Sequence, residues 1–162
     1  MISFLLMATA LTVRGDRLYI PAQINGVATE AVLDSAAEVT LLDDEFAERA
    51  DAAGGKAIKA RGSGAGEAEA RLVEHVRVEA LGVTLPDMTV AVMDLDDVGK
   101  RLFGRRLDAI VGRELFDAAR LSIDIEGGAI AVIPRSARPK GVRLALRPFH
   151  GNETIPVSIE GG

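Results

Sequence analysis

Apolar and polar residues alternate along several stretches of the chain, as expected for strands with one buried face. Residues 18–24 show this alternation, and Asn25-Gly26 follows directly. An Asn-Gly pair favours a two-residue hairpin turn, because both central residues of a type I′ turn need positive φ. We therefore expect a hairpin whose second strand, residues 27–34, ends at Asp34.

The pattern after this hairpin remains rich in strands. Residues 56–96 and 120–134 alternate and are interrupted by glycine-containing turns, so they are predicted to form hairpins. Short helices are expected at residues 45–53 and 113–119, and the polar stretch 96–106 is expected to be an exposed loop. Together these elements predict a small all-β domain with one or two short helices.

Asp43 and Asp44 stand directly before the first of these helices. An aspartate side chain at this position accepts a backbone N–H of the first turn, and the helix dipole stabilises its negative charge. We therefore interpret both residues as capping residues. Gly54-Gly55 is expected to end the helix.

Composition limits the partners and the chemistry. The chain has 162 residues, of which 48% are hydrophobic and 27% charged, and this suits one globular domain with its own core. The net charge is −5 and no basic stripe is interleaved with aromatic residues, so nucleic acid is not expected as a partner. The absence of cysteine excludes disulfides, thiol catalysis and thiolate metal sites.

Several other motifs fail on spacing. The glycine-rich residues 62–69 lack the Gly-Lys-Ser/Thr ending of a phosphate-binding loop, and residues 94–105 end in arginine where a calcium loop needs a bidentate glutamate. His75 and His150 have no partner at metal-ligand spacing, and no serine stands in a nucleophile elbow. We therefore expect neither a cofactor nor a metal.

Asp34 is a lone acid between two apolar runs, in the stretch AVLDSAAEVTLL (31–42). A carboxylate among apolar groups destabilises the fold unless it is paired, hydrogen-bonded or protonated. Two interpretations follow. Asp34 either points to solvent at the end of its strand in a generic β-domain, or it takes part in chemistry.

Three sequence features follow one another in an order that indicates a fold family. VLDSAA (32–37) is followed by a glycine-rich hairpin and then by AIVG (109–112). This order and spacing resemble one lobe of the retropepsin-like aspartic proteases, the bacterial members in particular, from about residue 18 to residue 133. The resemblance implies an all-β fold, namely a small closed or partly open β-barrel lobe at residues 18–135.

The resemblance also implies roles for individual residues. Asp34 would be the catalytic aspartate, and the Ser35 hydroxyl would brace the opposing loop. The substrate-binding flap would be the hairpin tip formed by Gly62, Ser63, Gly64, Ala65 and Gly66.

In enzymes of this kind each lobe supplies one aspartate. Two adjacent carboxylates share one proton, so one activates a water molecule while the other polarises the peptide carbonyl. The implied partners are a peptide or protein substrate, and either a second copy in a homodimer or a second lobe in the same full-length chain.

Ala36 departs from the family pattern, which has glycine at this position. Its methyl group would crowd a partner aspartate, and the backbone would also be strained if the position needed positive φ. The alternative function is therefore an inactive or impaired protease-like domain that serves peptide binding or dimerisation.

The two ends of the chain have two interpretations each. Residues 1–17 are expected to form a strand or arm, with a signal-peptide remnant as the alternative, so cytoplasmic and exported or periplasmic locations both stay open. YIPAQING (19–26) recurs as TIPVSIEG (154–161). We interpret this echo in the extension 136–162 either as chance or as a linker and the first strand of a truncated second repeat.

Overall fold

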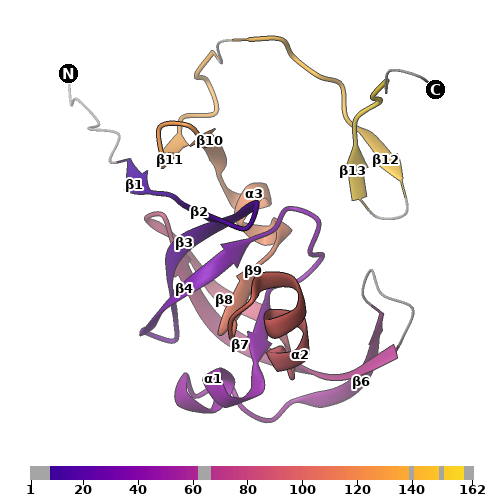
Figure 1. Ribbon diagram of the computed structural model, residues 1–162. Helices are drawn as coiled ribbons and strands as arrows, with labels where there is room; N and C mark the ends of the chain where they lie inside the picture. The colour runs from indigo at the N-terminus through magenta and orange to yellow at the C-terminus, as the bar shows by residue number, and fades with distance from the viewer. Residues whose placement is uncertain (1–7, 62–66, 139–140, 150–151, 159–162) are drawn as a thin grey trace.

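The computed structural model describes residues 8–61, 67–138, 141–149 and 152–158 (Figure 1). The strands are β1 (Thr9–Ala10), β2 (Thr12–Arg14), β3 (Arg17–Ile24), β4 (Val27–Leu33), β5 (Leu41–Asp43), β6 (Lys56–Arg61), β7 (Glu67–Ala80), β8 (Val83–Met93), β9 (Ala109–Val111), β10 (Arg120–Asp124), β11 (Ala129–Ile133), β12 (Arg147–Phe149) and β13 (Asn152–Thr154). The short helices are α1 (Asp44–Arg49), α2 (Asp96–Val98), the π-helical turn η1 (Gly99–Phe103) and α3 (Arg113–Ala118). The all-β prediction is confirmed. None of the described helices is long and apolar enough to cross a membrane.

Most of the strands belong to one eight-stranded sheet. Its order is β2-β3-β4-β9-β5-β8-β7-β6, and β3 also pairs with β7. Strand pairing therefore runs from β3 through β4, β9, β5, β8 and β7 back to β3, which encloses a core (Figure 1). A separate three-stranded sheet, β1-β11-β10, joins the N-terminal strand to the hairpin at residues 120–133.

The predicted hairpin at Asn25-Gly26 is confirmed. The φ angles of Asn25 and Gly26 are 48° and 84°, the positive values that a two-residue turn of this type needs. The Asn25 side chain also accepts the N–H of Arg77 on β7 at 2.8 Å. The turn is therefore fixed both by its own conformation and by a neighbouring strand.

Helix α1 begins as predicted but ends early. Asp43 is its N-cap, and Oδ1 of that residue accepts the Glu45 N–H at 3.2 Å. The helix ends at Arg49, not at residue 53, because Asp51 adopts a left-handed conformation with φ 49°. The Asn25 amide donates to the carbonyl of Ala50 at 2.9 Å and so satisfies a carbonyl at the helix end.

The prediction of an exposed loop at residues 96–106 is wrong, because α2 and η1 form there. The Asp94 carboxylate accepts the Asp96 N–H at 2.8 Å and so supports the first turn. Two ion pairs with i,i+4 spacing follow, Lys100–Asp96 and Arg101–Asp97. The charged residues that suggested a loop instead stabilise a helical segment.

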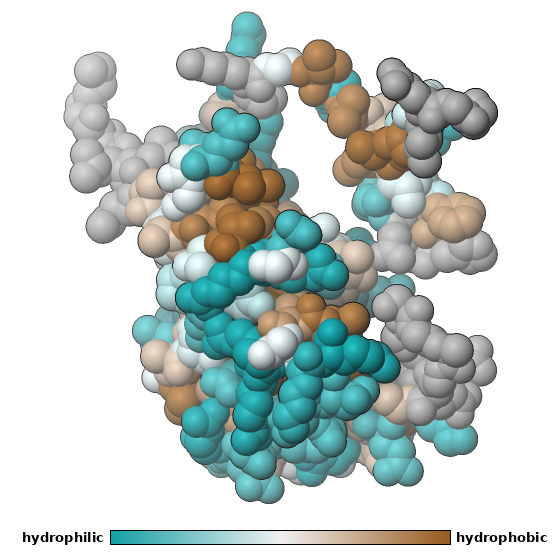
Figure 2. Space-filling view, viewed as in Figure 1, coloured by the Kyte–Doolittle hydropathy of each residue, from teal (hydrophilic) through white to brown (hydrophobic). Residues whose placement is uncertain are grey.

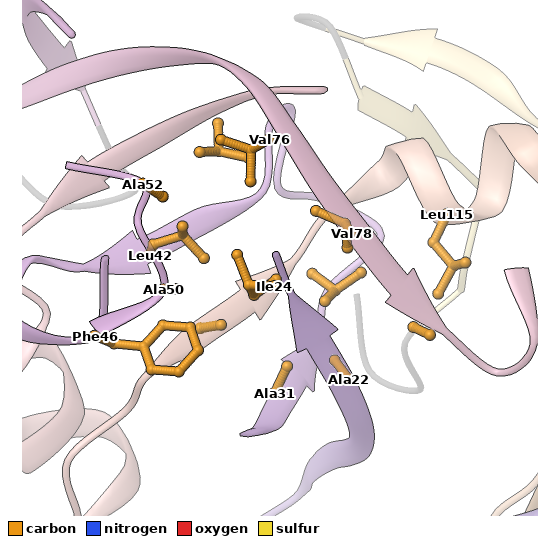
Figure 3. Close-up of a cluster of buried hydrophobic side chains, with 14 of the residues drawn as sticks. Ala22, Ile24, Ala31, Leu42, Phe46, Ala50, Ala52, Val76, Val78 and Leu115 are labelled. Carbon is orange, nitrogen blue, oxygen red and sulfur yellow. The ribbon is translucent and has the colours of Figure 1, made fainter. Parts of the chain in front are cut away.

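The core inside the ring of strands is aliphatic. Figure 3 shows side chains from β3, β4, β5, β7 and the helices converging on it, among them Ile24, Leu42, Phe46, Val76 and Leu115. All five are at most 1% exposed. Full burial of each such side chain contributes about 1.5–3 kcal/mol, so this cluster is the main source of stability for the lobe.

The order of three short strands determines where the candidate site lies. Strand β9 runs parallel to β4 on one side and antiparallel to β5 on the other. The chain therefore leaves β4 at Leu33, passes over the end of β9 through residues 34–40, and returns as β5 on the far side. Because β4 and β9 are parallel, the residues that follow each strand meet at one edge.

Candidate active site

Asp34 begins the loop at this edge. Its backbone N–H donates to the carbonyl of Val111 at 3.0 Å, which extends the pairing of β4 with β9 by one bond. Oδ1 of Asp34 accepts the Ala36 N–H at 2.9 Å, a side-chain hydrogen bond that stabilises the turn. The Asp34 side chain is exposed, so the carboxylate is hydrated in this lobe and is accessible to a second group.

The structure brings together the two motifs that carried the resemblance, VLDSAA and AIVG. Besides the Asp34–Val111 bond, the Arg113 N–H donates to the carbonyl of Ala37 at 2.9 Å. The loop after β4 is thus bonded at two points to the residues that follow β9. The two motifs are therefore adjacent in the fold and hydrogen-bonded through their backbones, as expected.

Thr40 and Glu114 hold the other end of the loop. Glu114 accepts the Thr40 N–H at 2.9 Å and the Thr40 hydroxyl at 3.2 Å. The Thr40 oxygen in turn accepts the N–H of Gly112 at 3.2 Å. Thr40 is fully buried, so its bonds replace the water that its polar groups lose.

Gly112 is needed because the loop passes directly over it. A Cβ at this position would lie 2.8 Å from the carbonyl oxygen of Ala37 and 2.9 Å from the carbonyl carbon of Val39. Both contacts are to backbone, which cannot move away without displacing the loop. The glycine of AIVG therefore permits the close approach of the Asp34 loop to β9.

Thr40 and Glu114 are the supporting residues that the sequence reasoning missed. Thr40 stands in the apolar run EVTLL, and Glu114 is the second residue of a predicted helix. A hydroxyl in a buried run needs a partner, and this is the one signal that pointed to Thr40. The identity of that partner depends on the crossing of β9 between β4 and β5.

Ser35 and Ala36 are both exposed beside Asp34. Ala36 is not among the described non-glycine residues with positive φ, which are Asp16, Asn25, Asp51, His75 and Leu81. The backbone at Ala36 is therefore not strained. Ala36 differs from the family's glycine only by its methyl group. The predicted flap residues 62–66 lie outside the described residues.

A hollow of about 680 Å³ lies between α1 and the paired strands β6 and β7. Ile58 and Ala70 of these strands line it, and an ion pair between Arg71 and Asp44 at 2.7 Å lies at its wall. Asp34 does not line this hollow. The hollow therefore lies beside the strands that lead to residues 62–66, not at the candidate aspartate.

Electrostatic support for the first hairpin comes from Glu30 on β4. Its carboxylate accepts hydrogen bonds from Arg14 on β2 and from Arg105, the latter at 2.9 Å. The hydrogen bond from Arg14, with a smaller contribution from Arg105, holds the pKa of Glu30 below its ordinary value of 4.5. Both guanidinium groups also lie 5.4 Å from the ring centre of the buried Tyr19.

Residues 20–115 match the family model described as aspartyl protease. The chain belongs to the aspartyl protease family. The matched region contains both the Asp34 loop and the residues after β9 that hold it, so the family match and the local geometry concern the same part of the chain.

One curated protein is similar to most of this chain. DNA damage-inducible protein 1 from Phaeosphaeria nodorum is 25% identical over 181 aligned residues, which cover 93% of this chain and 39% of that protein. The chain thus spans less than half the length of this curated relative.

Two solved structures are similar in fold. A retropepsin-like aspartic protease from Rickettsia conorii has a TM-score of 0.54 at 18% identity, covering 78% of this chain and 88% of that one. The EIAV protease complexed with the inhibitor HBY-793 has a TM-score of 0.46 at 20% identity, covering 62% and 86%. The likeness to the Rickettsia conorii protease, at 18% identity, shows the retropepsin-like fold alone.

Proposed function

We propose that this chain is a lobe of an aspartic endopeptidase that hydrolyses peptide bonds through Asp34 in a paired-aspartate site. The observation that carries the proposal is the position of Asp34. Asp34 is exposed at the start of a loop whose backbone is bonded to β9 at Val111, so its carboxylate is both fixed and open to a partner. Loops fixed on a rigid scaffold are where catalytic groups commonly lie.

The proposed mechanism needs a second carboxylate close to Asp34. Two carboxylates at that separation share one proton, because both cannot ionise side by side. The ionised member takes a proton from water, and that water attacks the peptide carbonyl carbon. The protonated member donates a hydrogen bond to the carbonyl oxygen, which stabilises the charge that develops there. The proton taken from water then passes from the first carboxyl group to the amide nitrogen, the C–N bond breaks, and the products leave as a carboxylic acid and an amine. Ser35 is proposed to brace the partner loop, and residues 62–66 are proposed to cover the bound peptide.

Asp34→Asn tests this proposal directly. The substitution keeps the size of the side chain and an acceptor for the Ala36 N–H, but it removes the group that carries the proton. Cleavage of a mixed peptide library, followed by mass spectrometry, is expected to fall by about 10²–10⁴-fold. Asp16→Asn is the matched control, since Asp16 is an exposed aspartate in the β2–β3 turn. Unchanged cleavage by Asp34→Asn would show that Asp34 is not the catalytic residue.

A second candidate function is supported by Ala36. The residue whose N–H binds the Asp34 carboxylate is exposed and carries a methyl group in place of the family's glycine. On this alternative the lobe binds peptides or associates with a partner but turns over slowly or not at all.

Ala36→Gly separates the two candidates. Removal of the methyl group is expected to raise kcat/KM by up to about 10²-fold if crowding misplaces the pair, because an error of about 1 Å has that effect. Stability is expected to fall by about 0.5–1 kcal/mol through the added freedom of the unfolded chain. Rapid cleavage by the unsubstituted chain, with no gain in Ala36→Gly, would exclude the impaired-domain alternative.

A further inference from the structure

The C-terminal hairpin, β12–β13, repeats the strand register of the hairpin β2–β3, which is called the first hairpin from here on. Adding 135 to each residue number of the β2–β3 ladder gives the β12–β13 ladder. Thr12 paired with Tyr19 becomes Arg147 paired with Thr154, and the next two pairs follow in the same way. The two ladders therefore have the same number of residue pairs and the same register.

The same offset aligns the sequences around these strands. Between residues 11–26 and residues 146–161 the identical positions, numbered in the first copy, are Leu11, Ile20, Pro21, Ile24 and Gly26. In the first copy Leu11, Ile20 and Ile24 face the core, and Gly26 completes the turn. The identities thus fall on positions that the first lobe uses for burial and turning.

The two copies differ in what covers them. Ile20 is fully buried and Ala22 is 4% exposed, whereas Ile155 and Val157 at the equivalent positions are 42% and 73% exposed. In the first copy β3 pairs with β4 and β7 as well as β2, but among the described strands β12 and β13 pair only with each other. Figure 2 shows the resulting apolar side chains along the C-terminal segment at the upper right.

We propose that residues 146–161 are the first hairpin of a second lobe, which is completed by residues that follow Gly162 in the natural chain. The exposed apolar side chains are then covered by that lobe's own equivalents of β4 and β7. An isolated two-stranded hairpin is marginal in water, so such cover is what this hairpin needs. The offset also places the equivalent of Asp34 about seven residues past Gly162, within the return strand or its loop.

This second lobe supplies the second carboxylate of the active site from within the same chain, a step that rests on the proposed function. The linker is anchored at its start, because Arg120 donates to the carbonyls of Arg135 and Ala137 at 2.8 Å. A covalently joined second lobe meets the first at a high effective concentration, which a separate second copy does not. The paired site then forms without dimerisation.

Amide hydrogen exchange, followed by mass spectrometry, tests the second lobe without any activity measurement. The natural chain is compared with the chain that ends at Gly162, and residues 20–24 are the internal reference for a covered strand. Residues 155–158 are expected to exchange as slowly as this reference in the natural chain and at the open-chain rate in the shorter one. Fast exchange in the natural chain, or a natural chain that ends at Gly162, overturns the proposal. Protection that appears in the shorter chain and rises with its concentration also overturns it, because a second copy then covers the hairpin.

Dilution tests the source of the second carboxylate. Cleavage per enzyme molecule by the natural chain is expected to stay constant over about 100-fold dilution, whereas a site formed by two copies loses activity as the copies separate. Replacement of the second-lobe carboxylate by Asn is expected to lower cleavage by about 10²–10⁴-fold. Activity that falls on dilution overturns the proposal that the same chain supplies this carboxylate. A protected second hairpin with no Asp34-dependent cleavage at any dilution rejects the proposed function and leaves the second lobe established.

Discussion

The hairpins β2–β3 and β12–β13 have the same register and nearly opposite surroundings. The first is part of the main sheet, with its apolar face in the core, while the second exposes the equivalent face. The strand pairing is therefore the same in both, but burial comes from strands that are distant in the sequence. The comparison separates what a short segment specifies by itself from what the rest of a lobe adds.

The Asp34 loop shows the same dependence on distant segments. Its hydrogen bonds to Val111, to Arg113 and to Glu114 all come from residues more than 70 positions away along the chain. The loop is therefore positioned by the crossing of β9 between β4 and β5, and a change in those distant residues should alter the site without touching Asp34.

The largest expected effect compares equivalent isoleucines in the two hairpins. Ile20→Ala removes a fully buried side chain and is expected to lower the free energy of unfolding by about 2–5 kcal/mol. Ile155→Ala, in the chain that ends at Gly162, is expected to have a much smaller effect, because that side chain is already 42% exposed. Urea denaturation monitored by circular dichroism measures both values.

These paired substitutions also test the proposed second lobe. If a second lobe covers the hairpin, Ile155→Ala there should destabilise the second lobe by an amount similar to the effect of Ile20→Ala on the first. Equal and small effects at both positions would contradict the burial that distinguishes the two hairpins.

A smaller effect is expected from Thr40→Val, which tests the distant bonds of the Asp34 loop. Valine keeps the shape of threonine but loses the hydroxyl that bonds Glu114 and accepts the Gly112 N–H. Leaving the buried Gly112 N–H without this acceptor should cost about 1–3 kcal/mol. The free energy of unfolding and the cleavage rate are expected to fall together, since the same bonds position Asp34.

Thr84→Val is the matched control for this substitution. Thr84 is an exposed strand threonine whose hydroxyl bonds Glu79 at 3.2 Å, so its loss is compensated by water. An effect of Thr40→Val no larger than that of Thr84→Val would mean that the buried hydroxyl does not hold the loop.

Features that depend on neighbouring residues could be predicted from the sequence. The Asn25-Gly26 turn needs only two residues that tolerate positive φ, and the cap at Asp43 needs only the first turn of its helix. The strand alternation and the echo at residues 154–161 are likewise visible in short windows.

Features that depend on distant contacts could not be predicted in this way. The end of α1 is stabilised by the Asn25 amide, which comes from a distant turn and bonds the Ala50 carbonyl. The helical segment at residues 96–103 was predicted as a loop because its many charged residues suggested solvent exposure. The i,i+4 spacing of those charges was nevertheless visible in the sequence. The Thr40–Glu114 pair requires knowledge that β9 lies between β4 and β5, and no local pattern contains that order.

The smallest expected effect concerns the ion pair that joins the first hairpin to β4. Arg14 on β2 lowers the pKa of Glu30 below 4.5, whereas the equivalent position in the second hairpin is Phe149. A carboxyl with a lowered pKa in the folded state adds stability above its unfolded pKa, and this contribution is lost as the pH falls through the folded value.

Because the pair is partly exposed, the contribution should be below about 1 kcal/mol. Glu30→Gln should therefore flatten the decline of unfolding free energy between about pH 6 and pH 3, and Arg14→Met should do the same. A decline as steep in both variants as in the unsubstituted chain would show that this pair does not stabilise the first hairpin.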